Sequence, residues 1–209
     1  MNTTKSEKVR SIEKAPAAYQ EYMEAERVWL DESISKTPSL LDVGCGKGRL
    51  LSFLKELTDT YTGIDLDSDA ISSAKSMEDQ DISFEVLDTQ NLSKRFSENT
   101  FTTTVCLWNT IGNIEEDTEA LSEMFKVTSG KAYISGIKKG MLEDRKAYYE
   151  AYDIDYELDE DKEIFYSKDW GMVRAYDVND FSLMCASVGF TVVKVVNLGK
   201  IAFGVELSK

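Results

Sequence analysis

The chain has 209 residues, of which 42% are hydrophobic and 30% charged, the balance of one globular domain rather than of a disordered or fibrous chain. Its 38 acidic and 24 basic residues give a net charge of −14, which argues against nucleic acid and anionic membrane surfaces as partners. The absence of histidine excludes a histidine general base, a Ser-His-Asp triad and any histidine-ligated metal.

The cysteines Cys45, Cys106 and Cys185 are far apart and form no Cys-x-x-Cys pair. They therefore predict neither a disulfide framework nor a zinc site, and we expect a reducing, cytoplasmic location. Residues 1–14 are polar and charged. No later run approaches the ~18 apolar residues of a membrane span, so we expect no targeting segment and no membrane partner.

Apolar periodicity and turn residues predict strands that alternate with helices along most of the chain. Helices are predicted over 17–35, 49–57, 68–77, 115–127 and 178–188. Strands are predicted over 40–43, 61–66, 83–87, 101–108, 131–137, 191–197 and 201–207. Pro38 is expected to end the first helix, and Asp67 or Ser68 to cap the helix over 68–77.

This alternation predicts an α/β fold with a doubly wound, mostly parallel sheet. The last two strands are too close in sequence for a helical crossover, so they must be antiparallel to each other. Residues 138–177 are too many for a simple connection and indicate an insertion. We expect a single domain, with a lead-in and helix over 1–36, a core over 37–138 and 173–209, and an inserted cap over 139–172.

A glycine-rich turn, Gly44-Cys45-Gly46-Lys47-Gly48, joins the strand over 40–43 to the next helix. Its glycines let the backbone turn sharply and approach a ligand, at the strand end where open α/β sheets bind ligands. Asp65 ends the next strand, where a carboxylate can accept hydrogen bonds from both hydroxyls of a ribose. A dinucleotide site would need glycine at position 49, which is Arg49. Asp42 would repel a pyrophosphate but suits an amino group and a sulfonium, so the sequence favours S-adenosylmethionine over NAD.

Four segments in order resemble the motifs of class I S-adenosylmethionine-dependent methyltransferases of the small-molecule type. Residues 41–51 resemble the first motif, and residues 61–67, 85–92 and 101–114 resemble the second, third and fourth. The resemblance implies a seven-stranded sheet with an antiparallel last strand, S-adenosylmethionine as cofactor, and methyl transfer as the activity.

The resemblance also implies where the cofactor is held. The glycine loop would approach the methionine part, Asp65 the ribose, and Leu66 and Asp88 the adenine. The implied cofactor-binding residues are Asp42, Gly44, Cys45, Gly46, Gly48, Asp65, Leu66, Asp88, Thr89, Leu107, Trp108 and Asn109.

The acceptor is less constrained. After the fourth strand the sequence reads Asn109-Thr110-Ile111-Gly112, without the Pro-Pro-aromatic or Pro-Cys signatures of enzymes that methylate nucleic-acid bases. Glu115, Glu116 and Asp117 lie at a predicted helix start, where acids are ordinary, so we expect no metal. A small-molecule acceptor is favoured. Alternatives are a protein or nucleic-acid methyltransferase, or a non-catalytic module that binds the cofactor.

The insertion is acidic and aromatic. Residues 141–163 hold ten acidic and three basic residues, and Tyr148, Tyr152 and Tyr156 are predicted to share a helical face. Such a cap would suit an amine through carboxylates and cation–π contacts; the alternative is that its tyrosines pack and its acids face water. Arg174 is expected to pair with carboxylates of the cap, and the alternative is a carboxylate of the acceptor. No general base is assigned, and the candidate acceptor-binding residues are Tyr22, Thr110, Tyr148, Tyr149, Tyr152, Trp170 and Arg174.

Overall fold

A computed structural model describes residues 14–168 and 170–209. In chain order, its helices and strands are α1 (Ala17–Ser33), β1 (Thr37–Val43), α2 (Leu51–Leu54), β2 (Thr58–Asp65), α3 (Ser68–Ala74), β3 (Ile82–Val86), α4 (Leu92–Arg95), β4 (Phe101–Cys106), α5 (Asp117–Val127), β5 (Thr128–Ile137), α6 (Leu142–Ala151), β6 (Glu157–Asp159), β7 (Ile164–Ser167), β8 (Gly171–Arg174), α7 (Val178–Ser187), β9 (Thr191–Leu198) and β10 (Ala202–Ser208). Short 3-10 helices are η3 (Lys55–Leu57), η4 (Lys75–Met77), η5 (Thr89–Asn91) and η6 (Thr110–Asn113).

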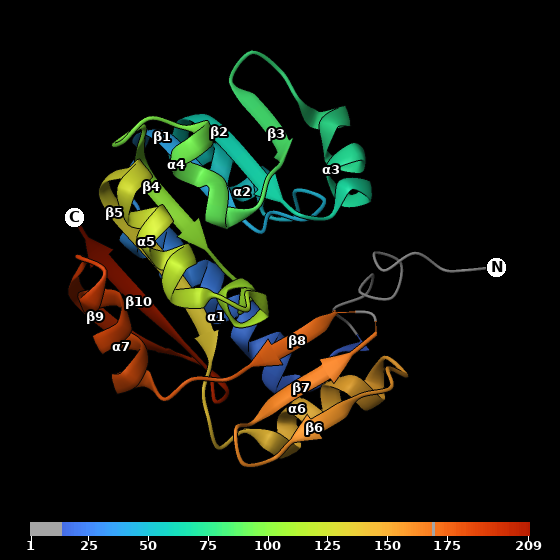
Figure 1. Cartoon of the computed structure of the whole chain (residues 1–209). Helices are drawn as coiled ribbons and strands as arrows, with labels where there is room; N and C mark the ends of the chain where they lie inside the picture. The colour runs from blue at the N-terminus through green and yellow to red at the C-terminus, as the bar shows by residue number, and fades with distance from the viewer. Residues whose placement is uncertain (1–13, 169) are drawn as a thin grey trace.

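Seven strands form one sheet in the order β3-β2-β1-β4-β5-β10-β9 (Figure 1). β1 pairs in parallel with β2 and β4, and the pairs β2–β3 and β4–β5 are also parallel. β10 runs antiparallel to both of its neighbours, β5 and β9. The predicted α/β fold, with a mostly parallel seven-stranded sheet and an antiparallel last strand, is therefore confirmed.

Helices cover both faces of this sheet, as a doubly wound fold requires. Leu30 of α1, Leu54 of α2 and Ile71 of α3 are buried in one apolar cluster. On the opposite face, α4, α5 and α7 contribute buried residues to a second cluster. Among the helices of the described ranges, none is long and apolar enough to cross a membrane.

The central strand β1 shows why the chain folds this way. Leu40, Leu41 and Val43 are at most 1% exposed, which is the continuous burial expected of a parallel strand covered on both faces.

Pro38 was expected to end the first helix, and this prediction is wrong. The helix ends at Ser33 with Ile34 in an extended conformation, and Pro38 lies second in β1, near the strand start where its missing N–H is tolerated.

Two further elements differ from the sequence prediction. The helix expected over 49–57 is a single α-helical turn followed by the 3-10 helix η3. The short helix α4, between β3 and β4, was not predicted. It has one buried residue, Leu92, so it carries no apolar periodicity that a sequence pattern could reveal.

The insertion between β5 and α7 folds as helix α6 and a separate antiparallel sheet in the order β6-β7-β8, below the main sheet in Figure 1. It has its own apolar cluster, centred on Tyr149, Ile154 and Phe165. The helical face predicted for the tyrosines is wrong at Tyr156, because α6 ends at Ala151. The ring of Tyr156 instead lies 5.0 Å from that of Phe165.

The two ends of the insertion return to the same place on the core. Lys139 N donates to Tyr176 O at 2.9 Å, and Tyr176 N donates to Ile137 O at 2.9 Å. These bonds close the insertion at its base, so its length has little bearing on the sheet above it.

Candidate active site

Three adjoining cavities lie at the carboxyl ends of β1, β2 and β4, where open α/β sheets bind ligands. The outer cavity, of about 720 Å³, includes Gly44, Asp65 and Leu66 in its wall. The loop cavity, of about 460 Å³, lies against the glycine-rich turn. The aromatic cavity, of about 170 Å³, lies toward the insertion. Trp108 lines all three.

The glycine-rich turn needs glycine for two separate reasons. Gly44 has φ +76°, and a Cβ there would lie 2.3 Å from Cγ2 of Thr110, so no side chain fits. Gly46 has φ +55° and no atom within 4 Å of where its Cβ would be. It lines the loop cavity, so its backbone is open to a ligand.

Asp65 fixes this turn to the end of β2. Its Oδ2 accepts a hydrogen bond from Gly46 N at 2.8 Å, and its Oδ1 accepts one from Asp67 N at 2.9 Å. Each oxygen keeps capacity for a further donor. The neighbouring Leu66 is 68% exposed and lies in the wall of the outer cavity, so an apolar surface stands beside the carboxylate.

Asp42 lies buried in the wall of the loop cavity. Burial raises its pKa to about 6, although the Tyr61 hydroxyl, which donates to Oδ2 at 2.7 Å, and the charge of Arg49 both oppose the rise. Lys47 and Arg49 line the same cavity. Neither cation was predicted to have a role, although Lys47 lies in the glycine turn and Arg49 directly follows it.

The other cofactor-binding candidates fall into two groups. Thr89 lines the outer cavity, and Cys45 and Leu107 line the loop cavity. Gly48 and Asp88 line none of the three cavities; Asp88 instead caps η5 by accepting from Gln90 N at 3.0 Å.

Asn109 lines the aromatic cavity and neither of the other two. Both ends of its amide bind backbone. Its Oδ1 accepts from Ile137 N at 2.9 Å, and its Nδ2 donates to Arg174 O at 3.2 Å. Its side chain therefore ties the end of β4 to β5 and β8.

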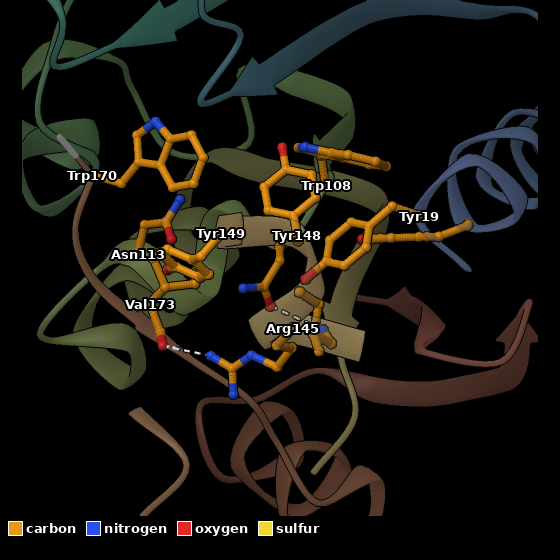
Figure 2. Close-up of a pocket in the computed structure, with 11 residues that line it drawn as sticks. Tyr19, Trp108, Asn113, Arg145, Tyr148, Tyr149, Trp170 and Val173 are labelled. Carbon is orange, nitrogen blue, oxygen red and sulfur yellow. Dashed lines mark hydrogen bonds between the residues drawn. The ribbon is translucent and has the colours of Figure 1, made fainter. Parts of the chain in front are cut away.

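The aromatic cavity lies between α1, the end of β4 and α6 (Figure 2). Tyr19 stacks on Tyr148 with centroids 4.1 Å apart, and Tyr22 stacks on Trp108 at 4.8 Å. Tyr149 and Trp170 also line it. Tyr19 was not predicted as a site residue, although it lies one helical turn before the candidate Tyr22.

The charges around this cavity agree with the alternative in which the tyrosines of the insertion pack and its acids face water. Arg145 is the cavity's charged wall residue, and its guanidinium donates to Glu163 O and Val173 O, each at 2.7 Å. Among the described residues, no acidic side chain lines the aromatic cavity. Most carboxylates of the insertion are exposed to solvent, namely those of Glu143, Glu150, Asp153, Asp155, Glu157, Glu160 and Asp161.

The remaining acceptor candidates lie elsewhere. Thr110 lines the outer and loop cavities, whereas Tyr152 and Arg174 line none of the three. The expected pairing of Arg174 with cap carboxylates is wrong. Its guanidinium pairs with Asp117, at the start of α5, because the side chain turns toward the core.

Backbone conformation at Trp108 is unusual. Trp108 and Asn109 have φ of +55° and +58°, a region that residues with side chains rarely adopt. Trp108 N donates to Glu26 Oε1 and to Ser135 Oγ, each at 2.9 Å. Glu26, on α1, was not singled out from the sequence. Its signal was a charged residue on the apolar face of that helix.

A family model described as a methyltransferase domain matches residues 40–130, the part that carries the glycine turn, Asp65 and Trp108. No curated protein matches the sequence.

Solved structures share the fold. A SAM-dependent methyltransferase from Aquifex aeolicus is 18% identical, with TM-score 0.65 and 99% of each chain covered. Magnesium protoporphyrin IX methyltransferase from Synechocystis, solved with S-adenosylhomocysteine, is 14% identical, with TM-score 0.63 and 94% of this chain and 86% of that chain covered. A Burkholderia thailandensis 1,6-didemethyltoxoflavin-N1-methyltransferase is 13% identical, with TM-score 0.66 and coverages of 90% and 78%.

The sheet order, the glycine turn with Asp65 at the next strand end, and the matched domain all agree. Residues 40–130 therefore form a methyltransferase domain, and the chain has the fold of S-adenosylmethionine-dependent methyltransferases.

Proposed function

We propose that this enzyme methylates a small-molecule acceptor held in the aromatic cavity. The observation that carries the proposal is the junction of two cavities. The aromatic cavity and the outer cavity share Trp108, Asn113 and Trp170. A methyl donor in the outer cavity would therefore lie next to an acceptor in the aromatic cavity, and in-line transfer requires such direct contact between the methyl group and the accepting atom.

The residues of the outer and loop cavities fit the cofactor. Asp65 would accept from the ribose hydroxyls, while Leu66 would lie against the adenine. The open backbone at Gly46 would face the methionine part, which carries charges of both signs, and the loop cavity offers both Asp42 and Arg49. When bound, S-adenosylmethionine supplies a methyl group on a positively charged sulfur.

The aromatic cavity limits the acceptor. Its volume of about 170 Å³ is below the ~300–1,000 Å³ of pockets for drug-sized ligands, so the enclosed part of the acceptor is about one ring in size. Without acidic groups among its described wall residues, the cavity offers an amine no carboxylate. An amine would have to be neutral, with its lone pair free, to accept a methyl group, and it would then pack against the aromatic rings as an uncharged group.

The proposal is tested by release of S-adenosylhomocysteine with a panel of small amines, phenols and nitrogen heterocycles, alongside a histone mixture and short nucleic acids. Turnover with a small molecule is the expected result. Turnover only with protein or nucleic acid would overturn the proposal. Tight S-adenosylhomocysteine binding with no turnover on any acceptor would favour the non-catalytic module.

Tyr149 supplies a prediction about the acceptor. Its hydroxyl is buried in the aromatic cavity wall without a hydrogen-bond partner. An unsatisfied buried hydroxyl costs about 1–3 kcal/mol, so Tyr149→Phe should raise the free energy of unfolding. The same change should raise the KM for the acceptor, because the hydroxyl would no longer be there to serve the acceptor. Chemical denaturation and steady-state kinetics measure the two effects.

Tyr176→Phe is the matched control. Its hydroxyl donates to Ile111 O at 3.1 Å and contacts Asp117 at 3.0 Å, so its loss should lower stability. A Tyr149→Phe enzyme that is less stable and has an unchanged KM would show that the hydroxyl does not serve the acceptor.

Asp42 supplies a prediction about pH. Its pKa of about 6 means that it is largely protonated at pH 5 in the free enzyme. A cofactor amino group beside it would favour the ionised form, so binding would release a proton. Affinity for S-adenosylmethionine should rise from pH 5 to 7, by at most about tenfold per unit, and then level off. Calorimetry at several pH values measures it, and Asp42→Asn should flatten the profile. An equally steep profile in Asp42→Asn would assign the proton to another group.

A further inference from the structure

We infer that Glu26, together with Ser135, is a positioning residue that holds Trp108 in the conformation that shapes the cofactor and acceptor cavities. The role in catalysis rests on the proposed function, but the positioning itself does not. Glu26 is absent from the walls of the three cavities, so it would act through Trp108.

The backbone conformation of Trp108 has to be stabilised by its surroundings. Its φ of +55° places a bulky residue in the left-handed region, which persists only where surrounding contacts fix it. The structure supplies two such contacts at one atom. Trp108 N donates to Glu26 Oε1 and to Ser135 Oγ, each at 2.9 Å.

The two acceptors of this N–H form one buried network. Ser135 Oγ donates to Glu26 Oε1, and the Tyr22 hydroxyl lies 2.8 Å from Ser135 Oγ. Glu26 is 1% exposed and Ser135 is fully buried. A buried carboxylate is tolerated only where hydrogen bonds or charges satisfy it, and here a hydroxyl and a backbone N–H from the active site do so.

The same network fixes the indole ring. Tyr22 stacks on the Trp108 ring with centroids 4.8 Å apart. The Arg49 guanidinium carbon lies 5.2 Å from that ring's centroid, at a distance typical of cation–π contact. The backbone and the ring of Trp108 are thus held by residues from α1, β5 and the glycine turn.

Position 26 is an unusual place for an acid, because the rest of this helix face is apolar or aromatic. The other buried residues of α1 are Tyr19, Tyr22, Trp29 and Leu30, all with large apolar or aromatic side chains. Placing an acid among them costs stability unless it binds a specific donor. Here one of its donors is the backbone of the residue shared by all three cavities.

The experiment needs no methyl acceptor. The whole protein is labelled with 5-fluorotryptophan, and its fluorine NMR signals from Trp29, Trp108 and Trp170 are assigned with Trp→Phe variants. Binding of S-adenosylhomocysteine is measured by calorimetry. In Glu26→Ala, the Trp108 signal should shift or broaden more than the Trp29 signal. Affinity should fall about tenfold, because the binding-competent conformer becomes a minor population.

Glu123→Ala is the matched control. Glu123 is also buried, at 5% exposed, and also accepts from a backbone N–H of another element, Ser93 N at 2.7 Å. It should lose stability without moving the Trp108 signal or the affinity. Glu26→Gln keeps an oxygen acceptor and should restore most of the signal position.

Ser135→Ala replaces the Glu26 variant if Glu26→Ala does not fold, since it removes the second acceptor of Trp108 N with little change in volume. It should move the same signal. An unmoved Trp108 signal and unchanged affinity in a folded Glu26→Ala or Ser135→Ala protein would overturn the inference. Failure of the acceptor panel alone would count against the proposed function and leave this result intact.

Discussion

Asp65→Ala should weaken binding of S-adenosylhomocysteine by about 100-fold or more. The substitution would remove the two charge-assisted hydrogen bonds that we propose Asp65 accepts from the ribose, worth about 1.5–3 kcal/mol each. It also frees Gly46 N, which Asp65 holds at 2.8 Å, so the glycine turn loses its anchor to β2. Calorimetry on the folded variant measures the loss.

Asp67→Ala is the comparison two residues away. Asp67 caps α3 by accepting from Asp69 N at 2.9 Å and Ala70 N at 3.1 Å, and loss of a cap costs about 1 kcal/mol of stability. Asp177, which caps α7 in the same way, gives the size of that effect away from the cavities. Equal losses of affinity in the Asp65 and Asp67 variants would mean that the ribose site is misassigned.

Removal of residues 141–173, replaced by a short glycine-serine linker, should abolish methyl transfer while cofactor affinity changes by only a few fold. The closure of the insertion at Lys139 and Tyr176 allows the cut. Asp65, Leu66 and the glycine turn all lie outside it. The deletion removes Tyr148, Tyr149 and Trp170 from the aromatic cavity, so water would reach the transferring methyl. Arg174 is retained because Asp117 depends on it.

Turnover by the truncated enzyme at a rate near that of the intact protein would show that the insertion does not enclose the acceptor. Loss of cofactor binding together with turnover would instead show that the insertion supports the core. Circular dichroism and S-adenosylhomocysteine binding on the same preparation separate these cases.

The sequence predicted best where local chemistry decides the structure. The apolar run over 40–43 predicted a buried strand, which the structure places at the centre of the sheet as β1. The glycine turn that follows was informative only together with Asp65 and the later segments. The Asp67 cap was also predictable, since an aspartate before a helix satisfies free backbone N–H groups; its side chain makes those bonds.

Contacts between distant segments could not be predicted in the same way. The backbone N–H of Trp108 donates to Glu26, 82 positions earlier. The Arg174 guanidinium donates to Asp117, 57 positions earlier. Periodicity marks Glu26 only as a polar residue on an apolar face. Nothing in the local sequence tells whether Arg174 turns toward the insertion's acids or the core, because both offer a carboxylate.

The shared position of Trp108 has a thermodynamic consequence for the order of events. The Trp108 indole forms part of the wall of the outer, loop and aromatic cavities, so a ligand that shifts it in one of these cavities changes the shape of the other two. Donor and acceptor would then bind with a coupling free energy that is the same in either order. Conversion of the donor to its product would also change the affinity for the methylated acceptor. Dissociation of one product would therefore be coupled to dissociation of the other.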